Sequence, residues 1–205
     1  MPSLERNVGL LRGARVVLRP VEKTDLPAFT GWYSQYETLR ALSPGAIRLM
    51  NLDGEEDWYR SVQANKSMWT FAADAVDDVH HPDGRLIGSV SLMGVDAKNR
   101  SATFGISIAD PTMRGKGYGA EMVDLMLEWA FLELNLHRIQ LFVMGFNTAA
   151  IRLYERKGFQ HDGRLREAIW REGRYWDEHV MSLLRREWVP ARPELAAGTE
   201  WEIRE

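Results

Sequence analysis

The sequence predicts a single α/β domain in which a mixed, mostly antiparallel sheet is flanked by helices. Two β-rich runs, at 86–93 and 102–109, are joined by the polar segment 96–101, a pattern typical of an antiparallel hairpin. In the second half, an amphipathic helix precedes a strand at 138–144, which indicates one strand–helix–strand crossover. The chain has 205 residues, enough to bury a continuous core.

The other elements follow from local patterns. A strand predicted at 16–19 ends at Pro20. Asp25 is a candidate cap for a helix that runs toward Leu39. The remaining expected elements are helices at 55–64 and 120–135, and strands at 69–75, 159–163, 168–171 and 179–184.

Composition narrows the classes of function. The net charge of -3, with acids and bases interspersed, argues against an extended nucleic-acid interface. The chain has no cysteine, which excludes disulfides, thiolate metal sites and cysteine nucleophiles. Segment 1–11 lacks a signal-peptide core and no apolar run is long enough for a membrane span, so we expect a cytoplasmic protein without membrane contact. Residues 1–189 are expected to form the domain and 190–205 a peripheral tail.

A glycine-rich loop between a strand and an amphipathic helix is the clearest indication of a binding site in the sequence. Alternating glycines let the backbone approach a ligand, and successive N–H groups at a helix start cradle phosphate oxygens. A pyrophosphate is therefore the expected occupant, although a solvated turn is an alternative for the loop taken alone. Nucleoside-triphosphate and dinucleotide loops have a different spacing. The loop consists of Arg114, Gly115, Lys116, Gly117, Tyr118 and Gly119.

A second segment completes a recognisable pattern. Residues 147–159 read Asn-Thr-Ala-Ala-Ile-Arg-Leu-Tyr-Glu-Arg-Lys-Gly-Phe. With the loop, this segment resembles the GNAT superfamily of N-acetyltransferases, in which an Arg/Gln-x-x-Gly-x-Gly/Ala loop binds the pyrophosphate of CoA. Arg114, Gly117 and Gly119 fill that loop. Segments 134–138 and 173–177 are similar to the branch that holds ribosomal-protein and spermidine N-acetyltransferases.

The resemblance implies a GNAT-like sheet with a splay between its fourth and fifth strands, where the acetyl group lies. It implies acetyl-CoA as the cofactor and CoA as the product. The strand backbone at Ile106, Ser107 and Ile108 is expected to contact the pantetheine arm. The other cofactor-binding residues that the resemblance implies are Arg114, Gly115, Lys116, Gly117, Tyr118, Gly119, Ala120, Asn147, Ala150 and Tyr154.

Two of these residues have structural explanations as well. Asn147 is a good N-cap for a short helix that Gly158 ends, and the resemblance adds a hydrogen bond to the cofactor arm. Tyr154 lies two helical turns further on, nearly on the same face. A tyrosine on a short amphipathic helix is usually a core residue, but within this motif we assign Tyr154 as the catalytic residue, with its hydroxyl beside the departing thiol.

The general base is the part of the site that the sequence leaves open. Many family members carry a glutamate on the strand before the cofactor loop, whereas residues 102–105 here read Ala-Thr-Phe-Gly. A water relay or a carboxylate from the acceptor side must serve instead, and Asp177 and Glu178 are candidates that surface charge explains equally well. His80 and His81 lie in a turn and are expected to be solvated rather than to bind a metal.

The expected function is acetyl transfer to a primary amine, such as a peptide N-terminus, a polyamine or a small amine, in a ternary complex. A non-catalytic acyl-CoA-binding module is the alternative, and a nucleotide-phosphate binder is a third hypothesis. A homodimer is left open. Aromatic residues from the first half either line the acceptor pocket or pack in the core: Trp32, Tyr33, Tyr36, Trp58 and Trp69.

Overall fold

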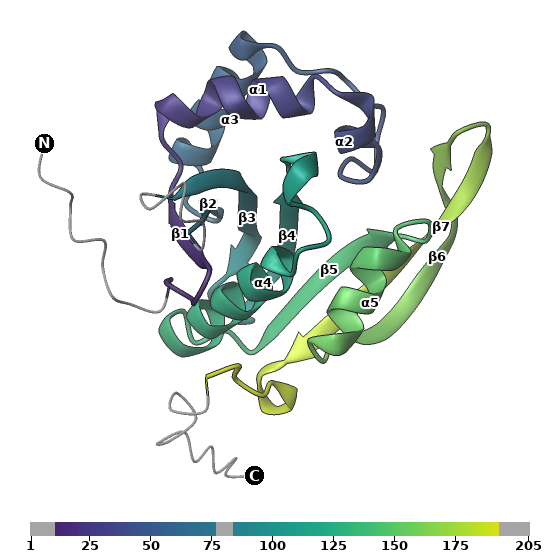
Figure 1. Ribbon diagram of the computed structural model, residues 1–205. Coiled ribbons are helices and arrows are strands. Elements are labelled where there is room, and N and C mark those ends of the chain that lie inside the picture. Colours follow the sequence, from purple (N-terminus) through teal and green to yellow (C-terminus); the bar gives the residue numbers. More distant parts are fainter. Residues whose placement is uncertain (1–10, 77–83, 193–205) are drawn as a thin grey trace, which may run out of the picture.

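A seven-stranded sheet organises the described part of the chain, which comprises residues 11–76 and 84–192 of a computed structural model (Figure 1). The strand order is β1-β2-β3-β4-β5-β7-β6. Every neighbouring pair is antiparallel except β4 and β5, which are parallel. The strands are β1 (Val16–Pro20), β2 (Trp69–Ala75), β3 (Arg85–Asp96), β4 (Ser101–Ile108), β5 (Arg138–Met144), β6 (Gln160–Arg171) and β7 (Arg174–Leu184).

The parallel pair β4–β5 is short, and this confirms the predicted splay. Only Ser101–Thr103 of β4 are in register with Arg138–Gln140 of β5. Beyond these pairs the two strands diverge, as Figure 1 shows, while β4 stays paired with β3 and β5 with β7. The backbone groups of β4 that point toward β5 are therefore available to a ligand over the rest of the strand.

Helices cover both faces of the sheet. On β2, Phe71, Ala73 and Ala75 belong to the main core, which α4 and α5 share, whereas Ala72 packs with the cluster under α1 and α3. This alternation follows from the two-residue period of a strand. The helices are α1 (Leu26–Tyr33), α2 (Tyr36–Arg40), α3 (Leu52–Ala64), α4 (Tyr118–Glu128) and α5 (Thr148–Arg156).

Several predicted elements have different boundaries in the structure. The helix expected from Asp25 to Leu39 is divided into α1 and α2. The helix expected at 120–135 starts earlier, at Tyr118, and its last turns, Trp129–Glu133, are π-helical. The runs at 159–163 and 168–171 form one strand, β6, because register shifts absorb the polar residues between them.

The tip of the β6–β7 hairpin is docked on the segment that follows α2. The Arg171 guanidinium donates to the carbonyl oxygens of Ser43, at 2.7 Å, and Gly45, at 3.1 Å. Arg40 pairs with Glu172 beside this contact. The hairpin tip and the α2 segment, far apart in the sequence, are thus held in contact.

The segment 77–83, which contains His80 and His81, and residues 193–205 of the expected tail lie outside the described residues. Among the residues that are described, none of the helices is both long and apolar enough to span a membrane. The domain boundary at 189, the cytoplasmic location and the homodimer stay predictions.

One arginine joins β1, β2 and the start of α1. The Arg19 guanidinium donates to Asp74 at 2.7 Å and to Asp25 at 2.8 Å. Both carboxylates are buried, with side-chain exposures of 4% for Asp74 and 7% for Asp25. Removing the cation would leave two buried anions facing each other.

We therefore expect Arg19→Met to lower the free energy of unfolding by about 3 kcal/mol, since losing one partner of a buried pair has a cost of this size. Urea denaturation measures the change. Arg60→Met is the matched control, because Arg60 makes two ion pairs on the exposed face of α3 and should contribute less than about 1 kcal/mol. Equal unfolding midpoints for the two variants would contradict a structural role for the Arg19 cluster.

Candidate active site

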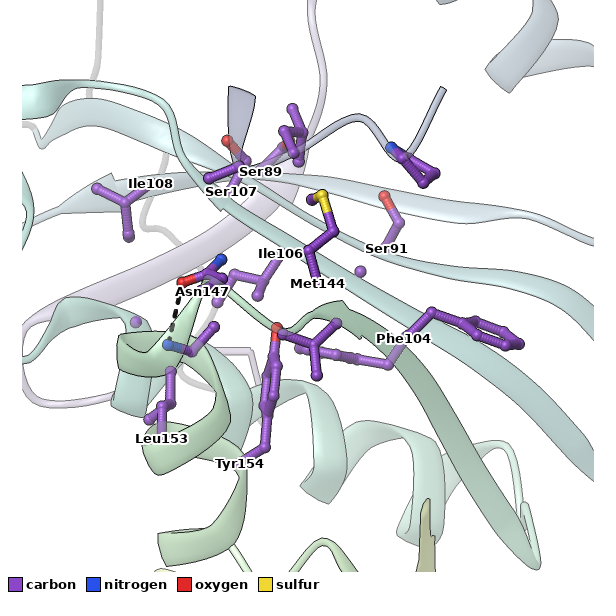
Figure 2. Close-up of a pocket in the computed structure, with 18 of the residues that line it drawn as sticks. Ser89, Ser91, Phe104, Ile106, Ser107, Ile108, Met144, Asn147, Leu153 and Tyr154 are labelled. Atoms are coloured by element: carbon purple, nitrogen blue, oxygen red, sulfur yellow. Dashed lines mark hydrogen bonds between the residues drawn. The ribbon is translucent and has the colours of Figure 1, made fainter. Parts of the chain in front are cut away.

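A cavity of about 840 Å³ occupies the splay between β4 and β5. One wall consists of β4, the start of α4 and the helix α5, which contribute residues such as Ile106, Gly119 and Tyr154. The opposite wall consists of α1, α2, α3 and the segment after α2, with residues such as Tyr33 and Trp58. Figure 2 shows labelled side chains from β3, β4, the end of β5 and α5 around the space beside β4.

The expected cofactor residues divide into two groups. Those that line the cavity are Ile106, Ser107, Ile108, Arg114, Gly119, Asn147, Ala150 and Tyr154. The others belong to the loop and the first turn of α4, outside the cavity: Gly115, Lys116, Gly117, Tyr118 and Ala120.

The glycine loop has the backbone that its composition predicts. Gly115 has φ 73° and Gly117 has φ 92°, values that side chains other than glycine rarely adopt. Gly117 caps α4, which begins at Tyr118. The Gly117 carbonyl oxygen accepts from the Ala120 N–H at 3.0 Å, so the N–H groups of the glycine loop lie ahead of the hydrogen bonds of α4. The loop therefore presents backbone donors at the positive end of α4, as an anion requires.

The Arg114 side chain turns inward rather than along the loop. Its Nε donates to the Ile108 carbonyl oxygen at 2.8 Å, and its guanidinium also contacts Thr38 Oγ1 at 3.2 Å. Arg114 thus holds the end of β4 against α2. In this arrangement its side chain lines the cavity and does not stand over the glycine loop, although the resemblance implies that Arg114 belongs to the pyrophosphate-binding loop.

A second cation, which the sequence analysis missed, lies at the loop. Arg15, just before β1, donates from Nη2 to the Lys116 carbonyl oxygen at 2.8 Å. Its guanidinium lies 4.5 Å from the centre of the Tyr118 ring, a cation–π contact. No local motif marks this residue, because it reaches the loop only through the pairing of β1 with β2 and the packing of α4 on β1.

Asn147 caps a helix as predicted, while its hydrogen bond to the cofactor arm stays a prediction. Its Oδ1 accepts a hydrogen bond from the Ala150 N–H at 3.2 Å, so it caps α5 (dashed line in Figure 2). The same residue lines the cavity. Because the oxygen is used by the cap, the side-chain NH₂ is the group that Asn147 can offer to a ligand.

Tyr154 lies in α5 with its ring buried and its hydroxyl directed into the cavity (Figure 2). The ring packs against Phe104 and Phe159, with centroids 6.2 Å and 5.7 Å away. Burial raises the pKa of Tyr154 to about 12, because the phenolate would lose its hydration. The residue is therefore a neutral hydrogen-bond donor throughout the physiological pH range.

The candidate aromatic residues of the first half have different positions. Tyr33 and Trp58 line the cavity. Tyr33 is buried, and its hydroxyl hydrogen-bonds to Ser107 and Ser89 on the adjacent strands β4 and β3. The other three pack elsewhere or are exposed: Trp32 against Phe29, Trp69 against Trp129, and Tyr36 at the surface.

The carboxylates near the site differ in whether they line the cavity. Thr103 to Gly105 line the cavity without an acid, as the sequence indicates. Glu178 of β7 lines the cavity, and burial raises the pKa of its carboxyl group. Asp177 points elsewhere and accepts the Glu167 N–H at 2.8 Å. Glu55 of α3, which the sequence analysis did not single out, is buried, and burial raises its pKa to about 7.

Comparisons with known proteins agree with this geometry. A family model described as an acetyltransferase (GNAT) domain matches residues 15–160. The spermidine N(1)-acetyltransferase of Vibrio cholerae is 33% identical over 165 residues, which are 74% of this chain and 95% of that protein. The SPbeta prophage-derived uncharacterized N-acetyltransferase YokL of Bacillus subtilis is 29% identical over 178 residues, which are 78% of this chain and 96% of that protein.

A solved structure has the same fold. The crystal structure of the Vibrio cholerae spermidine N-acetyltransferase in complex with CoA and spermine has a TM-score of 0.76 and 28% sequence identity. The match covers 85% of this chain and 98% of that chain. With its mixed sheet, its β4–β5 splay and a family match over most of its length, the chain belongs to the GNAT acetyltransferase family and is an N-acetyltransferase that acts on an amine.

Proposed function

We propose that the protein transfers an acetyl group from acetyl-CoA to a primary amine by direct attack in a ternary complex. The observation that carries this proposal is the cavity at the β4–β5 splay, into which the Tyr154 hydroxyl and the Asn147 side chain project from α5. The relative crystallised with CoA and spermine supports both the cofactor and an amine acceptor. The acceptor classes are peptide N-termini, polyamines and small amines.

The residues of the loop and of β4 fit an acyl-CoA. The positive-φ glycines at 115 and 117 bring backbone donors to the start of α4, where a pyrophosphate would lie, and Arg15 adds a cation there. The β4 backbone from Ile106 to Ile108 would pair with the amides of the pantetheine arm. One of its N–H groups would stabilise the oxyanion when the amine attacks the thioester carbonyl.

Tyr154 would act as a donor to the departing sulfur. A free thiol has a pKa of about 8.5, so complete proton transfer from a phenol with pKa about 12 is uphill by about 5 kcal/mol. A hydrogen bond that strengthens as the sulfur becomes negative avoids this cost. The second proton of the attacking amine can then reach the sulfur while Tyr154 stays neutral.

The alternative of a non-catalytic acyl-CoA-binding module is not favoured. The relatives, which match over nearly their full length, are named as N-acetyltransferases. In addition, Tyr154 lines the cavity. A nucleotide-phosphate binder is also disfavoured, since the apolar cavity beside β4 suits a pantetheine arm better than a base and ribose.

The proposal predicts thiol release from acetyl-CoA when the protein is mixed with a panel of primary amines. The panel contains spermidine, 2-phenylethylamine and a short peptide with a free N-terminus. Calorimetry with CoA on the same sample separates binding from turnover. CoA binding without thiol release for any amine would favour the binding module, and the absence of CoA binding by folded protein would refute the proposal.

Tyr154→Phe is expected to lower kcat by about 10²-fold, because only the hydroxyl that stabilises the leaving thiolate is lost. Acetyl-CoA affinity should change little, since the aromatic ring and its packing remain. Steady-state kinetics and calorimetry measure the two quantities. Tyr175→Phe, on the exposed hairpin, is the control. Equal turnover in wild type and Tyr154→Phe would exclude this role.

Gly117→Val is expected to weaken CoA binding by about tenfold or more, because a β-branched side chain strongly disfavours the φ of 92°. The loop must then change conformation, which misaligns its backbone donors. Gly31→Ala is the matched control, since a Cβ at this helical position meets no atom within 4 Å. Unchanged affinity in Gly117→Val would show that the loop does not bind the cofactor.

A further inference from the structure

Glu178 faces the acceptor side of the splay. It is paired with Met144 across the β5–β7 ladder, and directly opposed residues point to the same face of a sheet. Figure 2 shows the Met144 side chain directed toward Ser91, on the side of the cavity away from Tyr154. The neighbouring pair, Val143 and His179, points to the α5 side, where His179 contacts His161.

Along the strand direction, Glu178 also lies level with the part of β4 that is proposed to hold the thioester. When the short β4–β5 register is carried forward, Met144 comes level with Ser107, in the part of β4 proposed to hold the thioester end of the pantetheine. Glu178 is the next residue across, on the far side of β5. The wall formed by α1, α2, α3 and the segment after α2 is here called the acceptor wall. An amine that enters the cavity along this wall toward β4 therefore passes the Glu178 carboxylate.

Among the described residues that line the cavity, Glu178 is the single acidic side chain. The acceptor wall around it is largely apolar, with residues such as Leu42, Met68 and Phe142. An ammonium group loses its hydration on entering such a space and needs a partner of opposite charge. Glu178 is the group that can supply one.

We propose that Glu178 binds the ammonium group of the acceptor and serves as the general base of the reaction. This assignment rests on the proposed function. Glu178 takes one proton from the ammonium ion, and the nitrogen lone pair forms the C–N bond to the thioester carbonyl carbon. The C–S bond breaks, the remaining surplus proton of the nitrogen ends on the sulfur, and Glu178 releases its proton to solvent.

The electrostatic surroundings suit this role. Burial raises the pKa of Glu178, which makes its carboxylate a better proton acceptor. Several charged groups on the packed elements are engaged with other side chains or with backbone. They are Arg40 with Glu172, Arg164 with Asp177, Arg174 over the Trp176 ring, His161 with Glu155, and Arg114 with the Ile108 carbonyl.

Two other carboxylates are less suitable. Asp177 pairs with Arg164 at 3.2 Å and does not line the cavity. Burial raises the pKa of Glu55 to about 7, but Glu55 does not line the cavity either. Near Glu55 the cavity is lined instead by Tyr33 and by the serines of β3 and β4.

The test compares Glu178→Gln with wild type in thiol-release assays from pH 6.5 to about 9.5, a range that approaches an amine pKa of about 10. The acceptor is whichever of spermidine, 2-phenylethylamine or a short peptide wild type acetylates fastest. We expect kcat/KM of Glu178→Gln to be about 10²-fold lower near pH 7. The deficit should shrink about tenfold for each pH unit, because the variant needs amine that is already neutral.

Asp177→Asn is the matched control, since it removes one negative charge from the adjacent residue on the same strand. It should stay within about twofold of wild type. A pH-independent deficit in Glu178→Gln, or none, would overturn the assignment while wild-type turnover keeps the proposed function intact. If wild type acetylates no amine of the panel, the proposed function fails first and the assignment fails with it.

Discussion

The parting of β4 from β5 is the constraint on which the site depends. Three residue pairs join the strands, and beyond them each strand remains fully paired on its other side. The sheet therefore consists of two stable halves that are joined at one end. A ligand in the gap between them can form the hydrogen bonds that the missing strand pairing leaves open. A pantetheine arm, itself a chain of amides, is suited to such a gap because it can complete the β4 ladder as a missing strand would. Binding and positioning then depend on backbone, so residues such as Ile106 and Ser107 need no special side chains.

The two walls of this gap are held by different contacts. α5 is fixed by the Asn147 cap and by aromatic packing among Phe104, Tyr154 and Phe159, so the hydroxyl of Tyr154 is placed by the core rather than by a flexible loop. The acceptor wall is fixed at a distance, where Arg171 holds the segment after α2 against the hairpin tip. Elements far apart in the chain therefore line one cavity, and each half of this cavity is preorganised independently.

Local patterns predicted much of the fold. The strands β2 and β5 have the predicted boundaries, since apolar alternation and turn residues specify them directly. Asn147 caps α5 as predicted, and the helix ends at Arg156, shortly before Gly158. The break between α1 and α2, the π-helical turn of α4 and the inward rotation of Arg114 depend on tertiary contacts and had no local signal. The same is true of Arg15 and of the difference between Asp177 and Glu178. Adjacent acids on a strand are equivalent in sequence until the register decides which one faces the cavity.

Desolvation raises the pKa of both side chains assigned to the proposed reaction, the donor Tyr154 and the base Glu178, with opposite chemical consequences. In the buried ring of Tyr154 it raises the pKa and keeps the donor protonated beside the leaving sulfur. In Glu178 it raises the pKa of the carboxyl group, and so increases the affinity of the carboxylate for the proton of the amine. One apolar cavity can thus prepare an acid and a base without a hydrogen bond between them. Since both shifts come from the exclusion of water, a polar substitution in the wall between them, for example at Met144, would change the two pKa values in the same direction.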